Sequence, residues 1–153
     1  MNTLNEEEKR VILDKGTEAR FTGEYVNNKE TGVYVCRQCD APLYDSKSKF
    51  ESTCGWPSFD EAIKGSTIYH KDTTYGMIRT EVMCAKCGGH LGHVFDDGPT
   101  PTGKRYCINS VCLELKKADK KTQVPFAPFL ILSTLLVFFG FISFPMIFSL
   151  FSV

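Results

Sequence analysis

The chain has 153 residues, enough for one domain with a hydrophobic core and an additional segment. Its 18 lysine and arginine residues balance 18 aspartate and glutamate residues, so no basic surface indicates a nucleic-acid partner. All these charges precede Val124, and residues 124–153 are uncharged. The sequence therefore predicts a charged globular part followed by an apolar segment.

The first fifteen residues are charged and lack the apolar stretch of a signal peptide. The chain has seven cysteines, an odd number that cannot all pair internally. In a chain that is not secreted, cysteines more often bind metals or carry out redox chemistry than form structural disulfides. We therefore expect a cytoplasmic globular part, acting as a monomer, with metal-binding or redox cysteines.

Thr3 and Glu6 have the spacing of a capping box, which predicts a short N-terminal helix with Val11 and Ile12 facing inward. Short β-prone runs separated by turn residues follow. They predict strands at residues 32–35, 42–44, 49–50, 67–69, 76–83, 91–95 and 105–111, and a helical turn at 60–63. This pattern is typical of a mainly β domain with antiparallel sheets.

Two Cys-x-x-Cys motifs, Cys36–Cys39 and Cys84–Cys87, together offer four thiolates, the ligand set of a closed structural zinc site. They are far apart in the sequence, so a zinc ion would connect remote segments. One alternative is a redox dithiol, but such motifs accompany βαβ units, which the pattern does not predict. Another is a metal site that uses Cys87, His90 and His93.

If the four cysteines bind the metal, His90 and His93 are available for proton transfer or for contact with an oxyanion near neutral pH. His70 lies in a polar segment, and we interpret it as a surface residue. Trp56 stands between Gly55 and Pro57, outside any regular apolar pattern. This position favours a pocket wall, where an indole face can receive a methyl group or a sulfur atom.

In the predicted strand at 105–111, Arg105, Cys107 and Asn109 share one face because side chains alternate. A neighbouring guanidinium makes a thiol easier to ionise, and an amide can orient a polar substrate group. A buried structural cysteine is the other interpretation of Cys107, and the local pattern does not decide between them. Cys112 falls on the opposite face if the strand continues, whereas Cys54 on a distant loop remains a possible partner.

Taken together, these motifs resemble the methionine-R-sulfoxide reductase (MsrB) family. The resemblance rests on residues 105–110 (RYCINS), 90–95 (HLGHVF) and 55–59 (GWPSF) and on the two cysteine motifs, and it extends from about Leu4 to Lys117. It implies a mainly β fold of two antiparallel sheets, described as β-tent or Mss4-like, connected by one structural zinc ion. It also implies reduction of R-methionine sulfoxide in oxidised proteins.

The resemblance further implies that Cys107 attacks the sulfoxide and becomes a sulfenic acid, and that Cys54 resolves it as a disulfide. Thioredoxin or a similar dithiol would then reduce this disulfide. The remaining residues of the family pattern fall into three groups: polar residues around the sulfoxide oxygen (His90, His93, Asn109), pocket residues (Trp56, Phe95, Asp97, Arg105), and zinc ligands (Cys36, Cys39, Cys84, Cys87). Cys112 replaces a usual serine.

The resemblance does not cover the C-terminal segment. We therefore expect a reductase domain at 1–117, a basic linker at 118–125, and a hydrophobic transmembrane helix at 126–153. Lysines before the apolar segment predict a cytoplasmic domain anchored to a membrane, although Pro145 would kink or end the helix. A soluble cytoplasmic protein is the alternative.

Two other functions compete with a thiol reductase. A zinc-containing binding module would need the four paired cysteines but not, in addition, the pocket residues Cys107, His90, His93, Asn109 and Trp56. A metal-dependent hydrolase would need an open metal site with a carboxylate, which the sequence does not predict. The combination of pocket residues favours the reductase.

Overall fold

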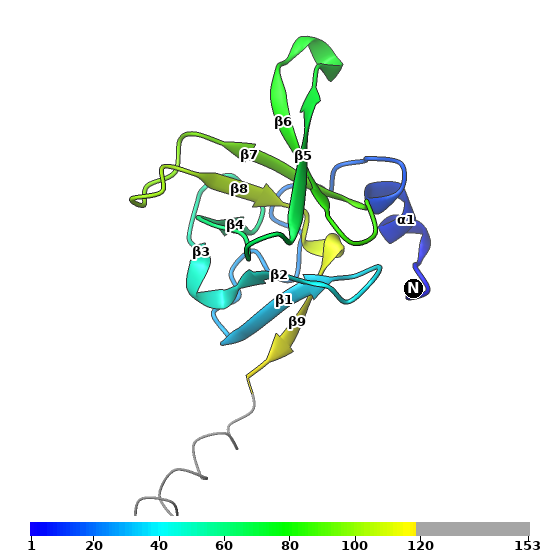
Figure 1. Ribbon diagram of the computed structural model, residues 1–153, viewed down its shortest axis with the longest axis horizontal. Helices are drawn as coiled ribbons and strands as arrows, with labels where there is room; N and C mark the ends of the chain where they lie inside the picture. Colours follow the sequence, from blue (N-terminus) through cyan, green and yellow to red (C-terminus); the bar gives the residue numbers. More distant parts are fainter. Residues whose placement is uncertain (119–153) are drawn as a thin grey trace, which may run out of the picture. The chain divides into compact units, whose positions relative to one another are not determined.

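The computed structural model describes residues 1–118, which form a compact unit of two antiparallel sheets and one short α-helix (Figure 1). The elements are α1 (Glu6–Ile12), β1 (Gly32–Cys36), β2 (Pro42–Asp45), β3 (Lys49–Phe50), β4 (Ser58–Phe59), β5 (Thr67–Asp72), β6 (Arg79–Cys84), β7 (His90–Phe95), β8 (Arg105–Ile108) and β9 (Leu113–Lys117). Three 3₁₀ turns, Ser46–Ser48, Thr74–Gly76 and Ser110–Cys112, complete the described part. The predicted fold class of two antiparallel sheets with a short N-terminal helix is confirmed.

The smaller sheet has the strand order β2-β1-β9, and the larger has the order β3-β4-β8-β7-β6-β5. In the larger sheet, Cys107 of β8 lies opposite Ser58 of β4 on one side and opposite His93 of β7 on the other. The end of the β5–β6 hairpin extends beyond the rest of the described domain (Figure 1). The larger sheet therefore places Cys107 at its centre, between the Trp56 loop and the histidine strand.

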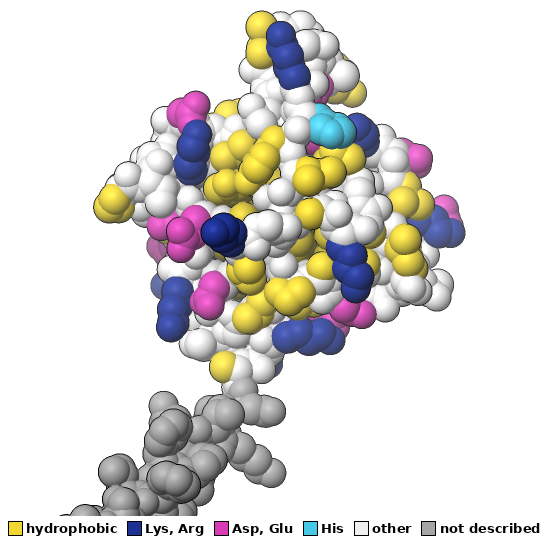
Figure 2. All heavy atoms as spheres, viewed as in Figure 1, with side chains coloured by type: hydrophobic (Ala, Val, Ile, Leu, Met, Phe, Trp, Pro, Cys, Tyr) yellow, Lys and Arg dark blue, Asp and Glu magenta, His cyan; other side chains and the backbone are white. Residues whose placement is uncertain are grey.

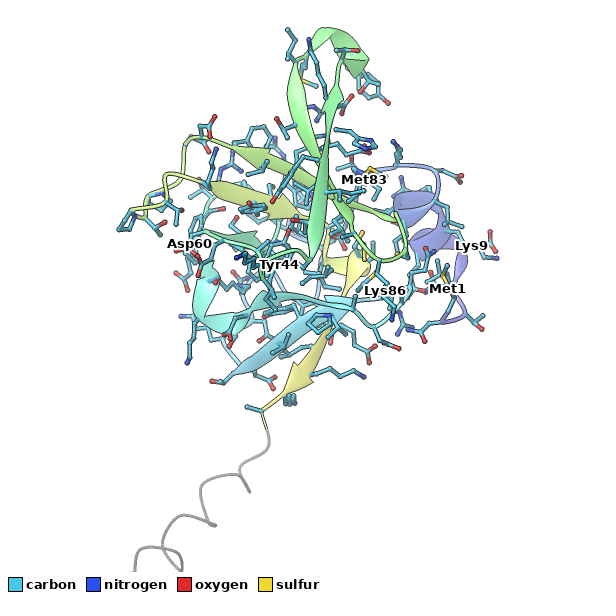
Figure 3. All side chains as sticks on the ribbon, viewed as in Figure 1. Met1, Lys9, Tyr44, Asp60, Met83 and Lys86 are labelled. Carbon is cyan, nitrogen blue, oxygen red and sulfur yellow. The ribbon has the colours of Figure 1, made fainter. Side chains whose placement is uncertain are left out.

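Aromatic rings from both sheets form the core. Tyr34 of β1, Tyr44 of β2 and Phe59 of β4 are fully buried, and the Tyr44 and Phe59 rings are stacked with centroids 4.4 Å apart. Figure 3 shows Tyr44 in the interior of the domain. Charged side chains of both signs are interspersed on the face in Figure 2, as the zero net charge leads one to expect. The aromatic contacts stabilise the packing of the two sheets against each other.

The N-terminal helix begins later than predicted. Asn5, not Thr3, is its N-cap: Asn5 Oδ1 accepts a hydrogen bond from Glu8 N, and Glu8 Oε2 accepts one from Asn5 N. The expected box of Thr3 and Glu6 is therefore wrong. Glu8 also pairs with Arg37 at 2.9 Å, so one carboxylate caps the helix and anchors it to the domain. Thr3 and Asn5 are both possible cap residues in the sequence, which does not reveal that Arg37 holds Glu8 in place.

Two further local predictions are wrong. The helical turn at 60–63 does not form, because Ile63 N donates a hydrogen bond to Leu43 O and keeps this segment against β2. The strand at 105–111 ends at Ile108, where the chain turns into the 3₁₀ segment Ser110–Cys112. Cys112 is nevertheless buried, as expected of a core residue, and its thiol donates to His90 O.

Within residues 1–118, no helix has the length and apolar character needed to cross a membrane. The predicted transmembrane helix at 126–153 lies outside the described residues, as does the linker beyond Ala118.

Candidate active site

The four cysteines of the paired motifs lie together, although they come from different sheets. Cys36 ends β1 of the smaller sheet and Cys84 ends β6 of the larger one. Cys36 Sγ is 3.6 Å from Cys87 Sγ, Cys39 Sγ is 3.6 Å from Cys84 Sγ, and all four sulfur atoms lie within 4.8 Å of one another. Zinc–sulfur bonds of about 2.3 Å in a tetrahedron separate the sulfurs by about 3.8 Å. The cluster can therefore hold a metal ion.

Positive backbone φ angles shape both cysteine turns. Asp40 has a φ of 61° after the first motif, and Gly88 has a φ of 73° after the second. The turn carrying Lys86 reaches the other one, since Lys86 Nζ donates to Cys39 O at 3.3 Å. The alternative metal set of Cys87, His90 and His93 does not form, because both imidazoles are held by carboxylates in the larger sheet.

Cys54 and Cys107 form a second sulfur pair, with their Sγ atoms 3.6 Å apart. Cys107 is fixed by β8, and Cys54 lies on the loop before β4. Ser52 Oγ donates to Cys54 Sγ at 2.9 Å, and Ser58 Oγ is 3.3 Å from the same sulfur. Both thiols are free in the structure, and a disulfide requires only a modest approach of the two sulfurs.

The two thiols ionise as a pair. The hydrogen bond from Cys107 lowers the pKa of Cys54 to about 4, with Ser52 and Ser58 contributing in the same direction. The same bond, followed by burial, raises the pKa of Cys107, whereas Arg105 lowers it. Arg105 therefore lowers the pKa of Cys107, as predicted, but the hydrogen bond with Cys54 and burial raise this pKa by more. In this arrangement Cys54 is therefore the thiol that ionises more easily.

A cavity of about 330 Å³ opens over Cys107 and Cys54. Apolar walls come from Trp56, Phe95 and Met77, and polar groups come from His93 and Asn109. Thr17, Arg20, Arg79, Gly92 and Arg105 complete the lining. The size is at the lower end of small-ligand pockets, which suits a single side chain better than a large cofactor.

One of the three arginines that line this cavity, Arg105, is held in place from outside it. Arg105 forms two hydrogen bonds with the Asp97 carboxylate, at 2.9 and 3.0 Å, and its Cζ lies 4.6 Å from the centre of the Phe95 ring. Asp97 itself is exposed and does not line the cavity. Its structural effect is therefore to hold Arg105 over Phe95, beside Cys107.

The two histidines differ in position. His93 lines the cavity, and its Nε2 is 2.7 Å from Asp72 Oδ2. His90 is buried behind it, 3.1 Å from Glu81, and does not line the cavity. Burial lowers the pKa of His90, although Glu81 acts in the opposite direction. Of the two histidines, His93 is therefore the one that a group bound in the cavity can contact.

Glu18 connects several parts of the site and was not identified from the sequence. Its backbone N–H donates to Asn109 Oδ1 at 2.9 Å, its carbonyl accepts from Trp56 Nε1 at 2.9 Å, and its carboxylate accepts from Ser110 N at 2.8 Å. Asn109 also donates to Leu91 O at 2.9 Å. Asn109 therefore lines the cavity, but its side-chain amide already forms hydrogen bonds with the backbone of Glu18 and Leu91. The sequence predicts instead an amide that is free to orient a substrate group.

Asp72, Glu81 and Arg20 were also missed. Their contacts with the site depend on residues remote in the sequence, and no local motif marks them. Glu81 is one strand away from His90, and Asp72 is two strands away from His93, so neither carboxylate gives a linear signal. Only the pairing of β5 with β6 and of β6 with β7 brings these side chains together.

Comparisons with known proteins show the family of this chain. The model of the SelR domain family matches residues 4–117. A peptide methionine sulfoxide reductase MsrB of Acinetobacter baumannii is 54% identical over 121 residues, covering 78% of this chain and 87% of the relative. An MsrB of Pseudomonas entomophila is 57% identical over 123 residues, covering 74% and 94%. The solved Mis18 'Yippee-like' domain is more distant, with a TM-score of 0.46 and 17% identity over 60% of this chain and 100% of that domain.

Proposed function

This chain belongs to the MsrB family of peptide methionine sulfoxide reductases, and we propose that it reduces the R epimer of methionine sulfoxide in oxidised proteins with Cys107 as nucleophile. The observation that supports these roles is the Cys54–Cys107 pair, with sulfurs 3.6 Å apart, at an apolar cavity. The cavity accepts one side chain, and the pair supplies the two electrons that the reduction needs.

In the proposed first step, the substrate methyl group contacts Trp56 and Phe95, and the Cys107 thiolate attacks the sulfoxide sulfur. The sulfoxide oxygen takes up a proton, methionine leaves as the thioether, and the oxygen remains on Cys107 as a sulfenic acid. His93 is the proposed proton donor because it lines the cavity and Asp72 holds its Nε2.

In the proposed second step, the Cys54 thiolate attacks the sulfenic sulfur of Cys107. A disulfide forms, and the hydroxide that leaves takes up a proton and departs as water. Hydrogen bonds from Ser52 and Ser58, which lower the pKa of Cys54, favour this attack because the thiolate is the nucleophilic form. An external dithiol, such as thioredoxin, then reduces the disulfide and restores both thiols.

The other predicted site residues have supporting roles in this proposal. Arg105, held by Asp97, favours the Cys107 thiolate because it lowers the pKa of Cys107. Asn109 fixes the end of β8 and offers its remaining N–H to the substrate. His90, buried against Glu81, supports His93, whose ring centroid is 5.6 Å from its own.

We also propose that the cluster of Cys36, Cys39, Cys84 and Cys87 holds one zinc ion. The sulfur spacings fit a tetrahedral thiolate site, and four protein ligands leave no open position for substrate. When bound, zinc would supply a structural connection and no reaction step. For residues 126–153, we retain the proposal of a membrane anchor on the composition of the sequence alone.

An assay with separated sulfoxide epimers tests the proposal. The full chain, driven by dithiothreitol, is expected to reduce only the R epimer, and Cys107→Ser to abolish turnover. With thioredoxin as reductant, Cys54→Ser is expected to stop multiple turnovers while a single turnover with formation of the sulfenic acid remains. Turnover of the S epimer, or full activity of Cys107→Ser, would show that the assignment is wrong.

A further inference from the structure

Arg20 differs from the other arginines of the chain. Arg10, Arg37, Arg79 and Arg105 each form an ion pair with a carboxylate. In the part of the chain that the structure describes, no ion pair involves Arg20. Arg20 is exposed and also lines the cavity over Cys107. It is therefore a cation at the substrate cavity that remains free to bind an anion.

The position of Arg20 is set by three contacts with the Cys54 loop. Its Cζ lies 5.1 Å from the centre of the Trp56 ring. Its aliphatic stem packs on Gly55, where an added Cβ would come within 2.9 Å of Arg20 Cβ. The next residue, Phe21, donates its N–H to Gly55 O at 2.8 Å and has a φ of 62°, which is unusual for a bulky side chain. These contacts hold the guanidinium over the tryptophan instead of leaving it to move freely in solvent.

The charge of the cavity points to the kind of group that Arg20 binds. No aspartate or glutamate lines it, whereas three arginines do. Two of these, Arg79 and Arg105, are neutralised by Asp72 and Asp97. Stacking on an aromatic ring leaves the edge of a guanidinium available, and this edge matches a carboxylate with two parallel hydrogen bonds.

We propose that Arg20 is a specificity-determining residue that binds a carboxylate of the substrate close to methionine sulfoxide. This inference rests on the proposed reductase function and names the sequence context that the enzyme prefers. The carboxylate can belong to an aspartate or glutamate next to the oxidised methionine, or to methionine sulfoxide itself at the C-terminus of a peptide. The chemistry is the same for both sources, and the substrates of the test separate them.

The test compares short peptides that contain R-methionine sulfoxide. Peptides with both ends blocked carry glutamate, glutamine or lysine on either side of the sulfoxide. A further peptide has no charged side chain and ends in methionine sulfoxide with a free C-terminal carboxylate. Dithiothreitol-driven kcat/KM is measured for the full-length wild type and for Arg20→Gln, Arg20→Glu and Arg20→Lys. Lys64→Glu is the matched control, because it makes the same change in net charge at an exposed residue outside the cavity lining.

The wild type is expected to prefer glutamate peptides over lysine peptides by about two- to fivefold, the effect of an ion pair with partial access to solvent. Arg20→Gln should remove this preference mainly through KM, and Arg20→Glu should reverse it. Arg20→Lys should retain part of it, and added salt should reduce it. Lys64→Glu should keep the preference of the wild type. A preference only for the free C-terminal carboxylate would identify that source.

Two results would overturn the inference. Equal losses for glutamate, glutamine and lysine peptides in Arg20→Gln would show that Arg20 only supports Trp56. Reversal of the preference by Lys64→Glu as well as by Arg20→Glu would show that net charge, and not a contact at the cavity, determines it. Absence of turnover with every peptide in the wild type would instead contradict the reductase function itself, so the two failures are distinguishable.

Discussion

At the scale of single residues, Glu18 connects the parts of the candidate site. It contacts Trp56 on the loop before β4, and Asn109 and Ser110, which are adjacent just after β8. Two of these contacts use its backbone, and only the contact with Ser110 uses the carboxylate. A substitution of the side chain therefore separates the role of the carboxylate from the role of the loop.

We expect Glu18→Ala to reduce the free energy of unfolding by about 1–3 kcal/mol, because the buried N–H of Ser110 loses its acceptor. Glu18→Gln should cost less, since its amide oxygen can still accept this bond. Urea unfolding measures both variants. Equal losses in the two variants would show that the charge of Glu18, and not its hydrogen bond, stabilises the fold.

The stability of the wild type and that of Glu18→Gln should also depend differently on pH. Burial, opposed by hydrogen bonds from Ser110 and Val111, raises the pKa of Glu18 above its usual 4.5. The folded state therefore holds this proton more tightly than the unfolded state does, and stability falls as the pH rises from 4.5 through the raised value. Glu18→Gln cannot titrate, so unfolding measured across this window should show less decline than in the wild type.

The sulfur pair gives a second prediction for single residues. In Cys54→Ala, the bond that most raises the pKa of Cys107 is absent, whereas the opposing effect of Arg105 remains. We expect Cys107 to react with iodoacetamide at a lower pH in this variant than in the wild type, with rates followed by mass spectrometry at the Cys107 peptide. The double variant Cys54→Ala/Arg105→Gln is the control, and it should move the reactive pH range upward again.

At the scale of elements, the β5–β6 hairpin is linked to His93 through Asp72. Asp72 Oδ1 accepts hydrogen bonds from the backbone and hydroxyl of Thr74, at 2.9 and 2.7 Å. Its other oxygen binds Arg79 at 3.0 Å and His93 at 2.7 Å. One carboxylate thus holds the turn of the hairpin, the start of β6 and the proposed proton donor.

We expect Asp72→Asn to lower kcat/KM by about tenfold or more, because an amide N–H in place of one oxygen cannot accept from His93 or Arg79. Hydrogen bonds from Thr74, and then from His93, hold the pKa of Asp72 below its usual range. The carboxylate is therefore charged at every working pH, and the loss should persist from weakly acidic to alkaline pH. Thr74→Val is the control: it loosens the turn but keeps the charge beside His93, so an equal loss there would contradict a role for the charge.

Some elements of the fold can be predicted from the sequence, and others cannot. Strands such as β1 and β2 are predicted from β-prone runs between turn residues, and the four cysteines of the cluster have a spacing that the chemistry of zinc ligands explains. The end of β8 at Ile108 depends instead on Glu18, whose contacts with Asn109 and Ser110 turn the chain. Similarly, the hydrogen bond from Ile63 N to Leu43 O, and not the local helical tendency of residues 60–63, determines the conformation of this segment. Such contacts between remote residues leave no periodic pattern.

At the scale of the whole molecule, residues 124–153 bear on whether the protein is attached to a membrane. Their uncharged composition and length fit a membrane span, and the lysines before them fit the cytoplasmic side. We expect the full chain at native expression levels to remain in the membrane pellet after alkaline carbonate washing. A chain ending at Gln123 should appear in the supernatant. Recovery of the full chain in the supernatant would contradict the anchor.

The cluster of Cys36, Cys39, Cys84 and Cys87 joins residues of the two sheets, because Cys36 belongs to β1 and Cys84 to β6. Binding of zinc to four thiolates contributes on the order of 10 kcal/mol, comparable to the total stability of about 5–15 kcal/mol of many domains. Removal of the metal by a strong chelator, in the presence of a reductant, should therefore unfold the domain and abolish activity together. Circular dichroism and released zinc are measured in the same titration, with one zinc per chain expected.

Cys39→Ser and Cys112→Ser provide a matched comparison for this prediction. Both replace a cysteine thiol of the domain, but only Cys39 belongs to the cluster, whereas Cys112 is buried outside it. We expect Cys39→Ser to lose zinc and Cys112→Ser to keep one per chain even if its core packing is weakened. A chain that retains its sheets and its turnover after complete loss of zinc would show that contacts such as those of Tyr44 with Phe59 hold the two sheets together without the metal.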